Sequence, residues 1–106
     1  MWREINIENI KIEKVVGEFF LWMPINYPFF KLKIKIYENS KCKFRGTTDI
    51  ALKRKSTGEF EQASGYGGNV EEALINVIKD FDQMIKEEGI ENINQKDIRY
   101  VKWINF

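Results

Sequence analysis

Strict alternation of apolar and charged residues in one segment limits how this chain can fold more than any other feature. In "FFKLKIKIY" (29–37) the residues at every second position are apolar, and lysines fill the places between them. Side chains of a β-strand point alternately to the two faces of a sheet, so a period of two predicts a half-buried strand. The expected inward residues are Phe30, Leu32, Ile34 and Ile36, and the outward residues are Lys31, Lys33 and Lys35.

Two further strands are expected to follow in a meander. "ENSK" (38–41) has the polar residues of a turn, and residues 42–55 then continue as a second strand with Ile50 and Leu52 inward. "STG" (56–58) predicts a hairpin turn. A third strand is expected over 59–66, with Phe60 inward.

A helix over residues 70–88 is the clearest element of the chain. Asn69 is a good N-cap, and Glu72 three residues later completes a variant of the capping box. Gly89 supplies the stop. Apolar residues recur between them at helical spacing, so this stripe must lie on the sheet. The stripe consists of Val70, Leu74, Val77, Ile78, Phe81 and Met84 or Ile85.

These elements predict a single α+β domain over residues 1–106. We expect an antiparallel sheet of four or five strands, built as a three-stranded meander, then the helix, then a final strand over 97–106. The long amphipathic helix covers one face. Residues 29–106 form this core, and residues 1–28 are an N-terminal extension.

The first 16 residues fit two patterns. Ile5 and Ile7 alternate out of phase with Ile10 and Ile12, which predicts a strand with a bulge at Glu8–Asn9. The alternative is a helical stripe of Trp2, Ile5, Ile12 and Val16.

A glycine-rich turn leads into the helix in "SGYGGNVEEAL" (64–74) and could be taken for a phosphate site. A P-loop needs a lysine and a serine or threonine directly after its glycines, where this chain has Asn69, Val70 and Glu71. Glu71 and Glu72 also place negative charge at the helix N-terminus, where an anion would bind. We therefore expect a structural joint between strand and helix.

The same joint resembles the partner-binding domain of HicB-type antitoxins. The resemblance covers about residues 29–104 in a β-β-β-α-β order and rests on the glycine turn and the capped helix that begins with "EEAL". The matching residues are Gly65, Gly67, Asn69, Glu71, Glu72, Ala73 and Leu74. It implies a small intracellular domain that acts by covering another protein, and it does not specify a toxin as that partner.

Little catalytic chemistry is available to this chain, which has no histidine and one cysteine. Without histidine it lacks the usual general base, the Ser-His and Cys-His pairs, and most transition-metal sites. Cys42 is expected to be a structural or incidental thiol, and Asp49 an ion-pair partner of its cross-strand neighbours. We expect no catalytic residue, metal site, cofactor or enzymatic activity.

Basic residues of the meander form the first candidate surface. Strand periodicity is expected to place them on the face opposite the inward residues. Such a face fits three interpretations: a solvated surface, a contact for an acidic protein, or a nucleic-acid site. No aromatic residue alternates with the lysines on these strands, which argues against base stacking. The basic face consists of Lys31, Lys33, Lys35, Lys43, Arg45, Lys53 and Lys55.

An aromatic segment, "FFLWMPINYPFF" (19–30), is the second candidate surface. Aromatic residues and methionine are enriched at interface hot spots. The segment can instead cap the end of the core or form a dimer seam, and Trp103 and Phe106 are expected to join it. The partner-binding residues we predict are Phe19, Phe20, Trp22, Met23, Tyr27 and Phe29.

The sequence therefore predicts a non-catalytic protein that acts by protein–protein contact. By analogy it is an inhibitor or adaptor of the antitoxin or anti-CRISPR type, encoded by a phage or mobile element, with a bacterial toxin or defence nuclease complex as partner. The alternative is a nucleic-acid-binding module that uses the basic face; a homodimer is left open. No apolar run has the form of a signal peptide or a bilayer span, so we expect a cytoplasmic protein without a membrane partner.

Overall fold

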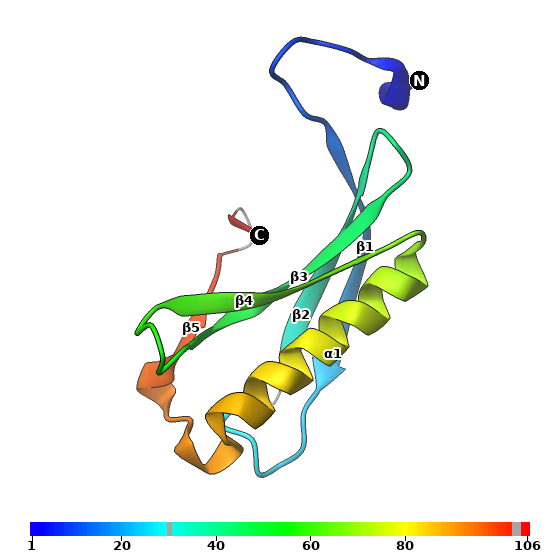
Figure 1. Cartoon of the computed structure of the whole chain (residues 1–106). Coiled ribbons are helices and arrows are strands. Elements are labelled where there is room, and N and C mark those ends of the chain that lie inside the picture. The colour runs from blue at the N-terminus through cyan, green and yellow to red at the C-terminus, as the bar shows by residue number, and fades with distance from the viewer. Residues whose placement is uncertain (30, 103–104) are drawn as a thin grey trace.

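The computed structural model describes residues 1–29, 31–102 and 105–106 (Figure 1). Within them the expected α+β fold is confirmed: a five-stranded antiparallel sheet carries one long helix on one face. Three short 3₁₀ helices span Trp2–Glu4, Ile90–Asn92 and Gln95–Asp97. The main elements are β1 (Glu13–Trp22), β2 (Lys31–Asn39), β3 (Phe44–Lys53), β4 (Phe60–Gly67), α1 (Val70–Glu88) and β5 (Ile98–Tyr100).

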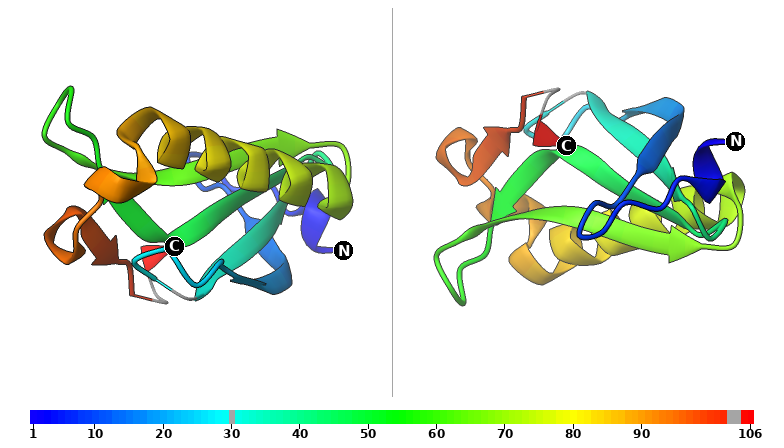
Figure 2. Two further views of the ribbon diagram at one scale, coloured as in Figure 1. Left: turned by 90° about the horizontal axis from the view of Figure 1, so that it is seen from below. Right: turned by 90° about the horizontal axis from the view of Figure 1, so that it is seen from above.

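The sheet has the order β1-β2-β3-β4, and β5 pairs with β3. β2 pairs with the first half of β3, as far as Thr48, and β5 pairs with residues Ile50 to Leu52. A bulge interrupts the β3–β4 register between Thr47 and Ala51. Figure 2 shows α1 along one face of the sheet and the C-terminal end of the described chain on the opposite face.

The core lies between α1 and the sheet. As the alternation in β2 predicts, Leu32, Ile34 and Ile36 are fully buried on the helix side. The glycine turn contributes by allowing close approach: a Cβ on Gly65 would lie 2.6 Å from the carbonyl carbon of Asn76 in α1. Glycine at this position therefore lets the helix rest directly on β4.

The ends of α1 also follow the sequence prediction. The Asn69 side chain accepts a hydrogen bond from the Glu72 N–H at 2.8 Å. At the other end Gly89 has φ +76 and donates its N–H to the carbonyl of Ile85. This positive φ suits glycine, which has no Cβ to clash.

One ion cluster, which sequence reasoning did not identify, ties the β3–β4 hairpin to the end of α1. Arg54 lies 2.5 Å from Glu87, 2.9 Å from Glu88 and 3.3 Å from Glu61. The main-chain N–H of Lys55 also donates to Glu88. The Glu88 side chain is largely buried, so its oxygens need these donors as hydrogen-bond partners.

The N-terminal prediction is wrong in detail. Residues 5–12 lie outside any strand, and Ile5, Ile7 and Ile10 are more than half exposed. A strand needs a neighbour for its main chain, and this segment leaves the sheet (Figure 1). β1 begins only at Glu13, and its bulge falls between Val15 and Gly17.

Two further expectations, for Phe60 and for the final strand, are corrected by the structure. Phe60 is not inward: it shares with Gln62 the face turned away from the helix, and the Arg99 guanidinium lies 4.0 Å from its ring centroid. The final strand is shorter than expected and ends at Tyr100. The predictions for Phe30 and Trp103 lie outside the described residues.

Candidate functional site

The sheet face turned away from α1, here called the outer face, carries most of the candidate residues. Cross-strand pairing aligns Trp22 with Lys31 and Phe20 with Lys33 at one end, and joins Tyr37 to Arg45 at the other. Paired residues share a face because side chains alternate along each strand. The outer face includes Glu18, Phe20, Trp22, Lys31, Lys33, Lys35, Tyr37, Arg45, Thr47, Ser64 and Tyr66.

Aromatic rings and lysines meet at the β1 end of this face. Trp22 is 70% exposed and Phe20 is 50% exposed. The Lys31 ammonium lies 4.9 Å from the Phe20 ring centroid and 5.5 Å from that of Trp22, and Lys33 lies 5.2 Å from Phe20. These are cation–π distances. We call Phe20, Trp22, Lys31 and Lys33 the aromatic–lysine patch.

The contacts in this patch change the expectation about base stacking. No aromatic alternates with the lysines within β2, but β1 supplies the rings from the neighbouring strand. Aromatic rings and lysines that do not alternate along one strand are thus brought next to each other by the pairing of two strands. The composition of the strands therefore no longer argues against stacking of bases.

The other predicted aromatic residues face elsewhere. Phe19 lies on the helix side and is half-buried. Met23 and Tyr27 follow β1 in a loop that packs against the core. Phe29 is buried, with its ring centroid 5.7 Å from that of Phe81. Alternation along β1 turns Phe19 inward, and the loop after β1 returns towards α1. Among the six residues, only Phe20 and Trp22 are therefore strongly exposed.

The seven predicted basic residues do not form one open surface. Lys43 and Lys55 lie in the hairpin turns, and Lys53 lies opposite Phe60 at the far end of β3. Arg45 is held by two hydrogen bonds to Glu13, at 2.7 and 2.8 Å, which lower the pKa of that carboxyl. Lys31 and Lys33 lie beside the exposed Phe20 ring, and Arg45 lies opposite the exposed Tyr66.

Lys35 lies buried at the centre of the outer face, where it is 3% exposed. Its ammonium donates to the main-chain oxygen of Phe106 and lies 4.4 Å from that ring centroid. Burial lowers the pKa of Lys35. The C-terminal end thus covers a lysine that the periodicity places outward.

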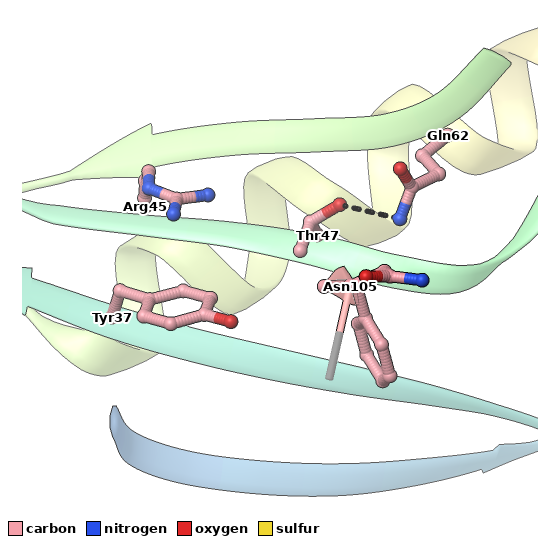
Figure 3. A pocket seen from close by; sticks show the side chains of 6 residues that line it. Tyr37, Arg45, Thr47, Gln62 and Asn105 are labelled. Carbon is pink, nitrogen blue, oxygen red and sulfur yellow. Dashed lines mark hydrogen bonds between the residues drawn. The ribbon is translucent and has the colours of Figure 1, made fainter. Parts of the chain in front are cut away.

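A polar pocket of about 310 Å³ lies beside this contact (Figure 3). In it the Gln62 amide donates to the Thr47 hydroxyl at 3.4 Å and to the Thr48 carbonyl at 2.6 Å. Among these lining side chains there is no carboxylate, thiol or imidazole to act as a base or nucleophile. They are Tyr37, Arg45, Thr47, Gln62, Asn105 and Phe106.

Asp49 and Cys42 lie apart from this pocket. Asp49 does not form the expected ion pair within the described chain; its carboxylate accepts the main-chain N–H of Lys33 at 2.8 Å. Cys42 is exposed in the β2–β3 turn, with φ +61. No metal-binding group of three or more His, Cys, Asp or Glu occurs among the described residues.

Asp49 provides a pH test of the structure. Burial raises its pKa above the ordinary value of 3.8, so the folded state holds the proton more tightly than the unfolded chain. Stability from this group is therefore lost as pH rises from below 3.8 through the folded pKa. An asparagine amide at this position does not titrate and can still accept the Lys33 N–H. We therefore expect the free energy of unfolding of Asp49→Asn, measured in urea, to be higher relative to wild type at about pH 7 than at about pH 3. The same difference between variant and wild type at both pH values would contradict this.

No family model, curated protein or solved structure matches the chain. The resemblance to HicB-type antitoxins therefore stays a prediction. In the part of the chain that the structure describes, no helix has the length and hydrophobicity needed to cross a bilayer.

Proposed function

We propose that the protein is a non-catalytic binding protein that acts through contact with another protein, made by the aromatic–lysine patch. The observation that carries this proposal is the pair of exposed rings, Phe20 and Trp22, which lie on the same side of β1 in the outer face. Burial of a desolvated aromatic anchor at an interface can contribute about 2 kcal/mol or more. Lys31 places positive charge beside the rings, whereas Lys33 is paired with Glu18 at 3.7 Å; the charge of Lys31 favours an acidic partner surface.

The role that fits this surface is that of an inhibitor or adaptor. Such a protein needs no reactive groups of its own; it blocks or bridges by occupying a partner's surface. The likeness of the glycine joint to HicB-type antitoxins supports a cytoplasmic inhibitor of the antitoxin or anti-CRISPR type, carried by a phage or mobile element. A bacterial toxin or a defence nuclease complex is the corresponding partner.

Capture of the partner tests this proposal. The immobilised protein should retain a protein partner from host extract after nuclease treatment, and Trp22→Ala should weaken that complex at least tenfold, about 1.4 kcal/mol. The matched control is Lys53→Ala with Lys55→Ala, two exposed basic residues at the far hairpin. We expect little change, because exposed charges contribute little once salt screens them. Loss of binding in the control with retention in Trp22→Ala would contradict the proposal.

Single-stranded nucleic acid is the second candidate ligand. The specific observation in its favour is that Lys31 and Lys33 lie within about 5 Å of the Phe20 ring, since proteins of this kind combine stacking rings with basic groups. A salt titration separates the candidates. Affinity for nucleic acid should fall with a slope of about −0.7 per neutralised phosphate, whereas a contact centred on Trp22 should depend much less on salt.

A further inference from the structure

The two long edges of the sheet differ in whether their outward main-chain groups are hydrogen-bonded. At the β4 edge, side chains of α1 bond the main chain: Asp80 accepts the Ser64 N–H at 2.9 Å, and Asn76 donates to the Tyr66 carbonyl at 2.6 Å. These groups would otherwise be available to another strand. The helix therefore closes the β4 edge.

The β1 edge is open, and the register shows which groups point outwards. Successive residues of a strand direct their N–H and C=O to opposite sides. Lys33 directs its N–H to Asp49 of β3, so its neighbours Leu32 and Ile34 face β1. Their partners Leu21 and Phe19 bond β2.

Glu18 and Phe20 therefore point their main-chain groups away from the sheet. No residue in the described chain bonds the main chain of either one on this side. From Gly17 to Trp22 the register with β2 is also continuous, since the bulge ends at Gly17. A regular strand with unpaired groups at its edge is a template for a further strand.

Both sides of this edge offer sites for the side chains of an added strand. On the outer face these are the rings of Phe20 and Trp22. On the helix side, an apolar pocket of about 210 Å³ lies between Leu21 and α1. Alternate residues of an added strand would enter this pocket and cover the patch. The pocket is lined mainly by Leu21, Met23, Tyr27, Ile78, Phe81 and Ile85.

The charge of Lys31 indicates which kind of strand would bind at this edge. The Lys31 ammonium lies over rings that β1 contributes, which brings it towards the open edge. Within the described residues Lys31 has no carboxylate at ion-pair distance. An acidic side chain on the outer face of an added strand would supply one.

We propose that the β1 edge receives an extended segment of the partner protein as an additional strand, with apolar residues towards the pocket alternating with acidic residues towards Lys31. This inference rests on the proposed function and names how the partner binds. The main chain provides affinity along Glu18 and Phe20, and the two faces provide specificity.

A pair of variants at one position tests the strand pairing. Glu18→Pro removes an outward N–H without breaking a bond to β2, whereas Glu18→Ala removes the same side chain and keeps that N–H. The probe is a capped peptide of roughly eight residues that alternates valine and glutamate, with a valine–lysine peptide as charge control. Fluorescence anisotropy measures binding, and circular dichroism checks that both variants fold.

The expected result is saturable binding of the valine–glutamate peptide to wild type and Glu18→Ala. Binding should be at least about tenfold weaker for Glu18→Pro, and the valine–lysine peptide should also bind about tenfold more weakly. Equal binding by the two variants, equal binding of the two peptides, or no saturable binding overturns the inference. Dimerisation of the wild type that Glu18→Pro abolishes also overturns it, because the added strand is then a second copy.

The same variants separate this inference from the proposed function. If the captured partner is lost with Trp22→Ala but binds Glu18→Pro as well as Glu18→Ala, the patch is the contact and no strand is added. If Trp22→Ala leaves the partner bound, the proposed function itself fails.

Discussion

Gly65→Ala is expected to destabilise the protein by about 3 kcal/mol or to prevent folding. The added methyl group would lie 2.6 Å from the Asn76 carbonyl carbon and closer still to the main-chain nitrogen of Val77. Cβ atoms essentially never approach other heavy atoms within 3.0 Å. Both clashing atoms belong to the main chain of α1, so relief requires the whole helix to move off β4.

Gly68→Ala provides the matched control three residues away. A Cβ on Gly68 would meet nothing within 4 Å, and its φ is not in the positive range. We expect a change within about 0.5 kcal/mol. Urea denaturation of both variants checks the pair. Similar unfolding midpoints would show that α1 does not rest on β4 as described.

Arg54→Ala is expected to cost about 2–3 kcal/mol. The guanidinium neutralises Glu88, whose side chain is 8% exposed, and it also contacts Glu61 and Glu87. Its removal leaves three carboxylates close together, one of them buried and, among the described residues, bonded by the Lys55 N–H alone. The repulsion acts where the β3–β4 hairpin meets the end of α1.

Lys86→Ala is the control for this cluster. Lys86 also pairs with a carboxylate on α1, Asp82 at 2.8 Å, but both side chains are at least half exposed. Pairs of this kind contribute about 0.3–0.5 kcal/mol. Thermal or urea unfolding should therefore show a loss several times larger for Arg54→Ala. Equal losses of unfolding free energy in the two variants would mean that the Arg54 cluster contributes no more than an exposed ion pair.

The fold could be predicted because its main signals are local. Alternation in β2, the cap at Asn69 and the stop at Gly89 each depend on a few neighbouring residues. Burial against α1 then follows, since Leu32, Ile34 and Ile36 have no other apolar surface to meet. The isoleucines before Glu13 carry the same local signal without a neighbouring strand, and the strand prediction for them was wrong.

The candidate site could be predicted only in part because it depends on contacts between distant residues. Residue type alone singles out Phe20 and Trp22, yet their separation from Phe19 follows from β1 being a strand, and the burial of Phe29 follows from the path of the loop after it. The burial of Lys35 depends on Phe106, 71 residues further along the chain. The orientation of the Glu18 main chain required the register of three strands. No local pattern contains that information.

The closure of one sheet edge by Asp80 and Asn76 has a consequence for assembly. Growth of an open-ended filament needs two complementary edges on every subunit, so that each copy can accept one neighbour and offer itself to the next. Within the described residues this sheet leaves one long edge, that of β1, without such bonds. If two copies paired there, β1 against β1, the open edge of each copy would be occupied by the other. The assembly would then stop at a two-fold symmetric dimer. We therefore expect the helix that builds the core also to limit open-ended growth from the exposed strand.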